Sequence, residues 1–161
     1  MKNITNSQQL IDFLHVAEVK ITYTTKVKPS ERLTVKCSRD AQRIFFDSWD
    51  QSTIEHKETV KMLLLNRANK VLGITTLSDG GISGSIMDVR MIFQYAIKSN
   101  ASGIIIAHNH PSGNTNPSES DLKITKKIKE AGDLLDIQLL DHIILTPEKE
   151  LFRSFADEGQ I

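Results

Sequence analysis

Residues 103–121 read Gly-Ile-Ile-Ile-Ala-His-Asn-His-Pro-Ser-Gly-Asn-Thr-Asn-Pro-Ser-Glu-Ser-Asp, an apolar run that ends in a cluster of polar side chains. Residues 104–107 are apolar at every position and mostly β-branched, which predicts a central strand that is covered on both faces. Pro111 cannot donate to a sheet ladder, so the strand should end before it, and turn-forming residues follow at 112–116. We therefore expect the chain to loop back over the end of this strand.

The two histidines of this segment are candidate metal ligands. Alternate side chains of a strand share a face, so His108 and His110 should point the same way, about 6 to 7 Å apart at roughly 3.3 Å per residue. Asp121 follows in the first turn of an expected helix. Two imidazoles and one carboxylate leave a fourth tetrahedral position for water, which is the composition of a catalytic zinc site. The alternative is that the histidines lie on the surface and that Asp121 only caps a helix.

The start of that helix has recognisable signals. Asn116 is a suitable N-cap, Pro117 fits the first helical position, and Glu119 stands three residues after the cap, as in a capping box. Ser118 and Asp121 would then share one face of the first turn, where the helix dipole favours an ionised carboxylate. The carboxylate should therefore be available as a ligand.

The spacing of these residues matches a known pattern. His108-x-His110-Pro111, six residues, then Ser118-x-x-Asp121 resembles the signature of the JAMM (MPN) metallopeptidase superfamily. The phrase Ala-His-Asn-His-Pro-Ser-Gly-Asn, followed by Leu-Leu-Asp-His-Ile-Ile-Leu at 139–145, is similar to the RadC-like branch of that superfamily, whose name refers to DNA repair.

The resemblance runs from about residue 38 to the C-terminus. It implies an N-terminal extension or arm at 1–37 and a RadC-like JAMM/MPN metallopeptidase domain at 38–161. The implied fold class is α/β, a mixed β-sheet sandwiched by helices in a cytidine-deaminase-like architecture. Strands and helices that alternate along the middle of the chain favour the same class, although the strand order is not predicted.

The resemblance also implies a reaction. JAMM enzymes hydrolyse a peptide or isopeptide bond with a metal-activated water and a glutamate that precedes an apolar strand. Glu58 stands in this relation to residues 62–65, and Glu55 is the rival position. Ser118 would donate a hydrogen bond to the oxyanion. The structural alternative pairs Glu58 with Lys61 on a surface. We expect one zinc ion per chain and a peptide or protein substrate.

Composition limits the possible partners. Lys and Arg total 20 and Asp and Glu total 20, so the net charge is zero. The chain therefore lacks the basic excess that would predict nucleic-acid binding. The single cysteine, Cys37, excludes a multi-cysteine zinc site and fits a reducing compartment, so we expect a cytoplasmic protein. The sequence shows no signal-peptide core and no apolar run near the ~18 residues of a membrane span, so no membrane partner is expected. Two other functions stay open: a non-catalytic metal-binding interaction domain and a DNA-repair-associated accessory protein.

Periodicity predicts the remaining elements. They are strands at 18–27, 60–65, 71–77 and 137–145 and helices at 7–16, from 38, from 88 and from 117, with 60–65 and 71–77 forming a hairpin. In the helix from 117, the expected buried stripe is Ile124, Ile128, Ala131 and Leu135. His142 has two interpretations, a partner that supports a metal ligand from behind or a histidine whose ring is satisfied by backbone groups. We favour the second and leave His142 out of the site. His56 has no assigned role.

Overall fold

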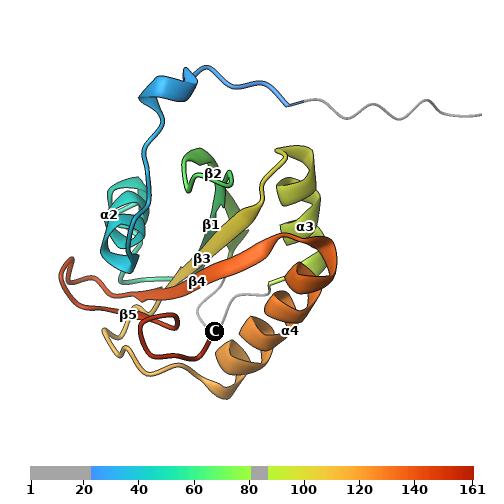
Figure 1. Cartoon of the computed structure of the whole chain (residues 1–161). Coiled ribbons are helices and arrows are strands. Elements are labelled where there is room, and N and C mark those ends of the chain that lie inside the picture. The colour runs from blue at the N-terminus through green and yellow to red at the C-terminus, as the bar shows by residue number, and fades with distance from the viewer. Residues whose placement is uncertain (1–22, 81–86) are drawn as a thin grey trace, which may run out of the picture.

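The computed structural model describes residues 23–80 and 87–161 (Figure 1). The predicted helix at 7–16 lies outside these residues, as does the first part of the predicted strand at 18–27; the described residues 23–27 form no strand. A short 3-10 helix, η1, spans Pro29–Glu31 and is followed by the α-helix α2 at Ser38–Ser48.

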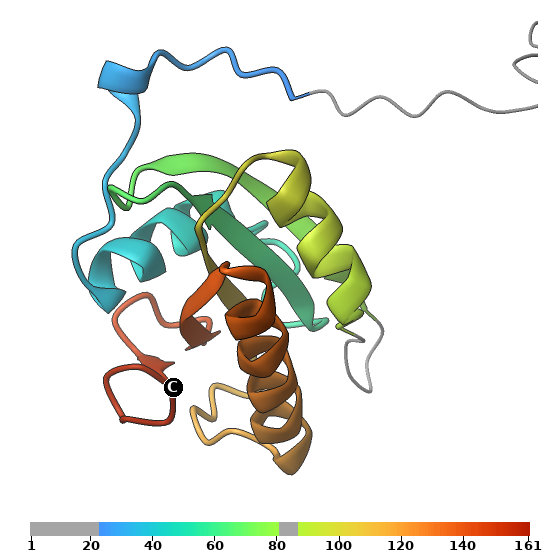
Figure 2. The same cartoon turned by 45° about the vertical axis from the view of Figure 1, so that its right-hand side comes forward.

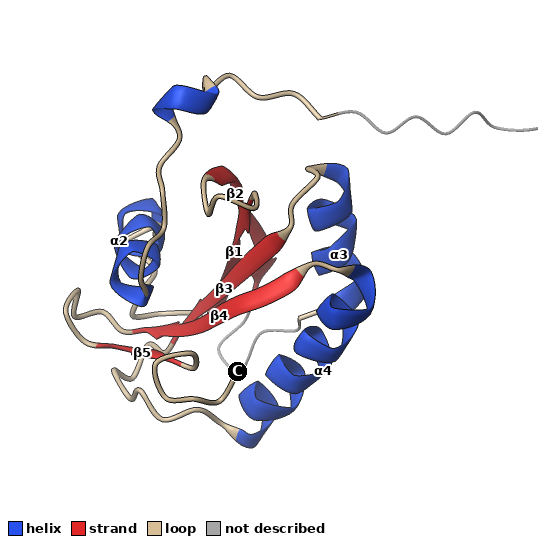
Figure 3. Cartoon of the chain, viewed as in Figure 1, coloured by secondary structure: helices blue, strands red, loops and turns tan. Residues whose placement is uncertain are grey.

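One mixed five-stranded sheet organises the described chain (Figure 3). Its strands are β1 (Thr59–Leu65), β2 (Val71–Asp79), β3 (Gly103–Asn109), β4 (Gln138–Leu145) and β5 (Phe152–Ser154). The spatial order is β2-β1-β3-β4-β5, and only β3 and β4 run parallel. The predicted hairpin is confirmed as β1 and β2, and the predicted central strand is confirmed as β3, which is buried along its whole length.

Helices cover both faces of this sheet. α2 packs on one face, and α3 (Val89–Lys98) and α4 (Glu119–Leu135) pack on the other, as Figures 1 and 2 show from two directions. This arrangement confirms the predicted fold class, an α/β protein with a mixed sheet between helices. Within residues 23–80 and 87–161, no helix is both long enough and apolar enough to cross a bilayer.

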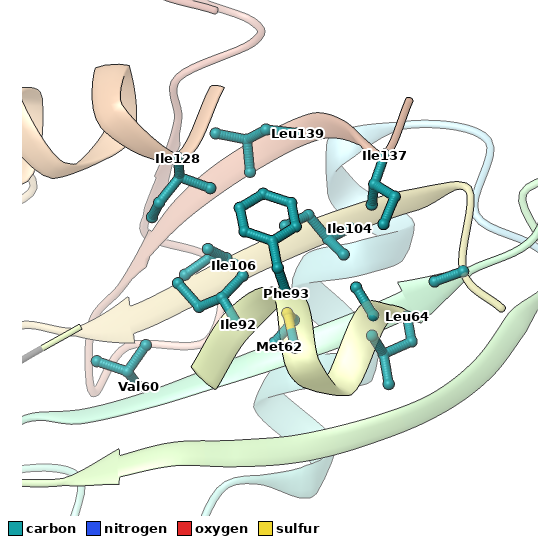
Figure 4. Packing of buried hydrophobic residues seen from close by; sticks show 12 residues of the cluster. Val60, Met62, Leu64, Ile92, Phe93, Ile104, Ile106, Ile128, Ile137 and Leu139 are labelled. Atoms are coloured by element: carbon teal, nitrogen blue, oxygen red, sulfur yellow. The ribbon is translucent and has the colours of Figure 1, made fainter. Parts of the chain in front are cut away.

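The alternation of side chains along β1 and β3 builds a separate core on each face. The core under α3 and α4 contains Val60, Met62, Leu64, Ile92, Phe93, Ile104, Ile106 and Ile128 (Figure 4). The core under α2 contains Phe45, Trp49, Leu63, Leu65, Ile105, Ala107 and Ile143. Because His108 follows Ile104 and Ile106 at the same two-residue spacing, its side chain lies on the α4 side of the sheet.

The strand β4 changes face part of the way along its length. Its pairing with β3 shifts by one residue between Ile104 and Ile105. Leu139 consequently belongs to the core under α3 and α4, whereas Ile143 belongs to the core under α2. Beyond the shift, His142 lies opposite Ile106 and shares its face of the sheet. The shift therefore places a histidine, rather than its neighbours, on the α4 side.

The buried stripe of α4 differs in part from the predicted one. Ile128 is buried as expected, but Leu135, at the last position of the helix, is 43% exposed. The chain leaves the helix at Asp136, which adopts a left-handed conformation. Thr125 and Gly132 are the other buried positions of this helix.

Candidate metal centre

Three potential metal ligands meet where β3 ends and α4 begins. His108 is the penultimate residue of β3, His110 follows the strand directly, and Asp121 lies in the first turn of α4. The Nε2 atoms of the two histidines are 3.1 Å apart, and the Asp121 carboxylate lies 3.4 Å from the first and 3.8 Å from the second. Among the residues that the structure describes, these three form the one group of His, Cys, Asp and Glu side chains placed to hold a metal ion.

The spacing of these atoms fits a tetrahedral ion. Zinc bonds of about 2.1 Å to nitrogen or oxygen place neighbouring ligand atoms roughly 3.4 Å apart in a tetrahedron. The observed separations are 3.1, 3.4 and 3.8 Å. Nδ1 of His110 lies 2.6 Å from the carbonyl oxygen of Asn114, and because a carbonyl only accepts, this nitrogen carries the ring proton. Nε2 of the neutral ring therefore presents a lone pair to the centre, as a metal ligand must.

The surroundings of Asp121 favour the ionised form of its carboxyl group. Burial acts to raise the pKa of the Asp121 carboxyl, but the adjacent His108 and His110 side chains and the Ser118 hydroxyl outweigh burial and hold the pKa well below its usual range. The adjacent Asp121 carboxylate raises the pKa of His110 against the effect of burial, and the negative charge of Glu58 acts in the same direction. Asp121 is therefore ionised at neutral pH, which is the state that metal binding requires.

The helix α4 begins two residues later than the sequence predicts. Its N-cap is Ser118, whose hydroxyl accepts the Asp121 N–H at 3.1 Å, while the Asp121 carboxylate accepts the Ser118 N–H at 2.7 Å. The prediction of a box between Asn116 and Glu119 was wrong because Ser118 and Asp121 form one themselves. The Ser118 hydroxyl also donates to Asp121 at 2.6 Å, so its single proton goes to a candidate ligand.

A cavity of about 590 Å³ is lined by one of the three candidate ligands, His110. It is lined by Glu55, His56, Glu58, His110, Pro111, Ser112, Asn114, Asn116, Pro117 and Ser118. Both glutamates that the sequence offers as the base thus border the same space as a candidate ligand. Glu58 is half-buried directly before β1, whereas Glu55 is exposed. A cavity of about 600 Å³ at the other end of the sheet contains none of the predicted site residues.

The lysine that could have neutralised Glu58 points elsewhere. Lys61 Nζ donates to the carbonyl oxygen of Ser48 at 2.5 Å and lies 5.0 Å from the centre of the Trp49 ring. The alternative interpretation, a surface pair of Glu58 with Lys61, is therefore wrong. Lys61 covers the end of α2 instead.

Two residues that sequence reasoning left out lie directly behind the ligands. His142 is fully buried, and its Nε2 lies 2.8 Å from Nδ1 of His108. Its Nδ1 lies 2.6 Å from Oγ1 of Thr125. The expectation that backbone groups satisfy His142 was therefore wrong. Thr125 stands one helical turn after Asp121, and this i, i+4 spacing is the signal that could have identified it.

Comparison with known proteins shows which family this sequence matches. The sequence model of the RadC-like JAB domain matches residues 35–160. The UPF0758 protein of Flavobacterium johnsoniae is 52% identical over 98 residues, that of Porphyromonas gingivalis 45% over 103, and that of Salinibacter ruber 37% over 131. The matches cover 61%, 64% and 81% of this chain but 42%, 45% and 54% of the relatives, so the chain spans about half the length of the curated relatives it matches. This match confirms the predicted family and fold class, and the chain belongs to the RadC-like JAB domain family.

Proposed function

We propose that this domain is a zinc-dependent hydrolase that cleaves an amide bond in a peptide or isopeptide substrate. The observation that carries the proposal is the convergence of His108, His110 and Asp121, together with a cavity that both His110 and Glu58 line. Membership of the JAB superfamily, which includes metalloproteases, supports the same class of reaction.

Each residue has a distinct task in this proposal. His108, His110 and Asp121 hold one zinc ion, because two imidazoles, a carboxylate and an open position are typical of its catalytic sites. When bound, zinc lowers the pKa of a water ligand toward about 7 and polarises the substrate carbonyl. Glu58 accepts the proton of the attacking water and returns it to the leaving amine.

The cavity suits an extended polypeptide better than a small apolar ligand. Its lining offers amide, hydroxyl, imidazole and carboxylate groups that can hydrogen-bond to peptide groups. The zero net charge of the chain gives no general attraction for nucleic acid. We therefore place a peptide or protein in this cavity as the substrate.

The metal is tested first. The purified protein should contain about one zinc ion per chain, and replacing both His108 and His110 by Ala should remove it, because a single carboxylate remains. Metal analysis of the two proteins gives the answer. Stoichiometric zinc in the doubly substituted protein would move the metal to another site.

The base is tested with a matched pair of substitutions. Glu58→Gln keeps the size of the side chain and all three ligands, so zinc content should be unchanged while hydrolysis falls by roughly 10²- to 10⁴-fold, the usual contribution of a general base. Glu55→Gln, at the rim of the same cavity, should leave hydrolysis unchanged. Cleavage of the best substrate from a peptide and isopeptide library is the measurement. A loss confined to Glu55→Gln would transfer the role of base to Glu55.

The library screen and a DNA-binding measurement test the two other functions. A zinc-loaded parent protein that cleaves nothing in a broad library would favour a non-catalytic metal-binding interaction domain. A DNA affinity that falls steeply with salt concentration would favour a DNA-repair-associated accessory protein.

A further inference from the structure

His142 occupies a completely buried position between a candidate ligand and the helix that carries another. Its ring stacks on Phe155, with the ring centres 4.7 Å apart and the planes inclined by 22°. One ring nitrogen lies 2.8 Å from His108 Nδ1 and the other lies 2.6 Å from Thr125 Oγ1. Both polar atoms of the ring are therefore used inside the protein, and neither reaches the candidate metal position.

The direction of these hydrogen bonds follows from a backbone carbonyl. Thr125 Oγ1 lies 2.6 Å from the carbonyl oxygen of Asp121, and because a carbonyl can only accept, the threonine hydroxyl donates there. The hydroxyl oxygen is then the acceptor for His142 Nδ1–H. In a neutral ring the other nitrogen of His142 has no proton, so it accepts from His108 Nδ1–H.

The last step of this chain leaves the lone pair of His108 Nε2 facing His110 and Asp121, at 3.1 and 3.4 Å. That is the tautomer in which the histidine can bind a metal ion. The ring of His142 is completely buried, and its two nitrogens face an imidazole nitrogen and a hydroxyl, so neither nitrogen has a carboxylate partner that would stabilise a second proton on the ring.

We propose that Thr125 and His142 are positioning residues that hold His108 in its metal-binding tautomer through a hydrogen-bond chain that begins at the backbone of Asp121. The proposal rests on the metal site proposed above. This hydrogen-bond chain starts at the backbone of one candidate ligand, Asp121, and ends at the ring of another, His108. It connects α4 to β4 and β3. Partners of this kind typically contribute 10- to 100-fold to metal affinity.

The threonine offers a clean test because valine has the same shape without the hydroxyl. In Thr125→Val, the buried Nδ1–H of His142 loses its acceptor, so the ring is favoured with its proton on Nε2 instead. That proton donates to His108 Nδ1, and His108 then carries its own proton on Nε2, where the metal would bind. Thr125→Ser keeps the hydroxyl and should preserve the chain.

Zinc affinity is measured by competition with a chelating dye for the parent, Thr125→Val and Thr125→Ser. We expect a 10- to 100-fold loss in Thr125→Val and a value within about threefold of the parent in Thr125→Ser. Thr146→Val is the matched control, because Thr146 is also buried and donates to the carbonyl of Leu151 at 2.7 Å, outside this chain. It should lower stability without changing zinc affinity.

A second measurement reads the tautomers directly. Long-range proton–nitrogen NMR spectra of the metal-free parent should show His108 and His142 protonated at Nδ1, and Thr125→Val should move both protons to Nε2. Equal zinc affinity in Thr125→Val and the parent, or a His142 proton on Nε2 in the parent, would overturn the positioning role. A parent that binds no zinc would instead overturn the proposed function, so the two failures are distinguishable.

Discussion

The carboxylate of Asp121 both takes part in the capping box of α4 and is a candidate metal ligand. One of its oxygens accepts two hydrogen bonds from Ser118, at 2.6 and 2.7 Å, and the other faces His108 at 3.4 Å. The capping box therefore fixes the carboxylate in place without help from a metal. A ligand that is held in advance loses less conformational freedom when the ion binds, so the cap and the metal site reinforce each other.

Replacing Ser118 by Ala should weaken this arrangement. The substitution removes the N-cap hydroxyl and its hydrogen bonds with Asp121, so we expect the free energy of unfolding to fall by about 1 kcal/mol, measured by denaturant titration. Ser120→Ala, on the exposed side of the same turn, is the control and should not lower stability.

The same variant addresses the predicted role of Ser118 as a donor to the oxyanion. Loss of such a donor costs about 10²- to 10³-fold in kcat. A fall of that size at unchanged zinc content would support the role. Unchanged turnover would leave Ser118 as the cap of α4 and the support of Asp121, the roles in which its hydrogen bonds are seen.

At the scale of elements, the junction of α4 and β4 depends on one close approach. The helix ends at Leu135, and Ile137 then returns its N–H to the carbonyl of Gly132 at 2.9 Å. A Cβ atom at Gly132 would lie 2.3 Å from the carbonyl oxygen of Ile137. Only glycine lets the chain fold back this tightly, and β4 starts directly after this turn. The junction therefore helps to set the position of His142 relative to Thr125.

Gly132→Ala should destabilise the protein although alanine is the better helix former. The helical preference favours alanine by about 1 kcal/mol, but the overlap with a backbone atom forces α4 away from β4, and we expect a net loss of roughly 1–3 kcal/mol. For a chain of this length that is a fall in Tm of several degrees. Gly73→Ala is the control, since the nearest atom to its added Cβ is 4.0 Å away. An equal or higher Tm for Gly132→Ala would show that the junction can relax.

For the whole molecule, the framework that holds the candidate site does not depend on a metal. Each face of the sheet has its own apolar core, and the three ligands belong to neither. Complete burial of one Ile or Leu side chain contributes about 1.5–3 kcal/mol, and both cores contain many such side chains. The metal should therefore add stability to a fold that already forms.

Removing the metal should lower the melting temperature without unfolding the chain. A ligand at 100 times its Kd adds about 2.7 kcal/mol, so a chelator should lower Tm by several degrees, measured by circular dichroism before and after treatment. The spectrum at room temperature should keep its helix and strand signals. A chelated protein with the spectrum of a disordered chain would instead mean that the metal is structural.

The sequence by itself determined the local elements and the ligand set. A largely apolar run followed by turn-forming residues at 66–70 identified the hairpin of β1 and β2. The fully apolar run identified β3 as central, and the spacing of His108, His110 and Asp121 identified the candidate ligands. These features depend on residues that are close in the chain, whose periods of 2 and 3.6 are imposed by strand and helix geometry. The helix cap was misplaced by two residues because Asn116 and Ser118 both have capping side chains, and only the folded loop selects between them.

Tertiary structure alone decided the strand order, the face of β4 that carries His142, and the hydrogen-bond chain behind His108. A one-residue shift in the pairing of β3 with β4 exchanges which side chains face α4, and nothing in the sequence of β4 marks where the shift occurs. The register is set by hydrogen bonds between two strands whose paired residues, such as Gly103 with Gln138 and Ile105 with Asp141, are 35 or 36 positions apart in the chain. The sequence specifies which residue stands at each position, but the contacts of its side chain are fixed only when distant strands pair.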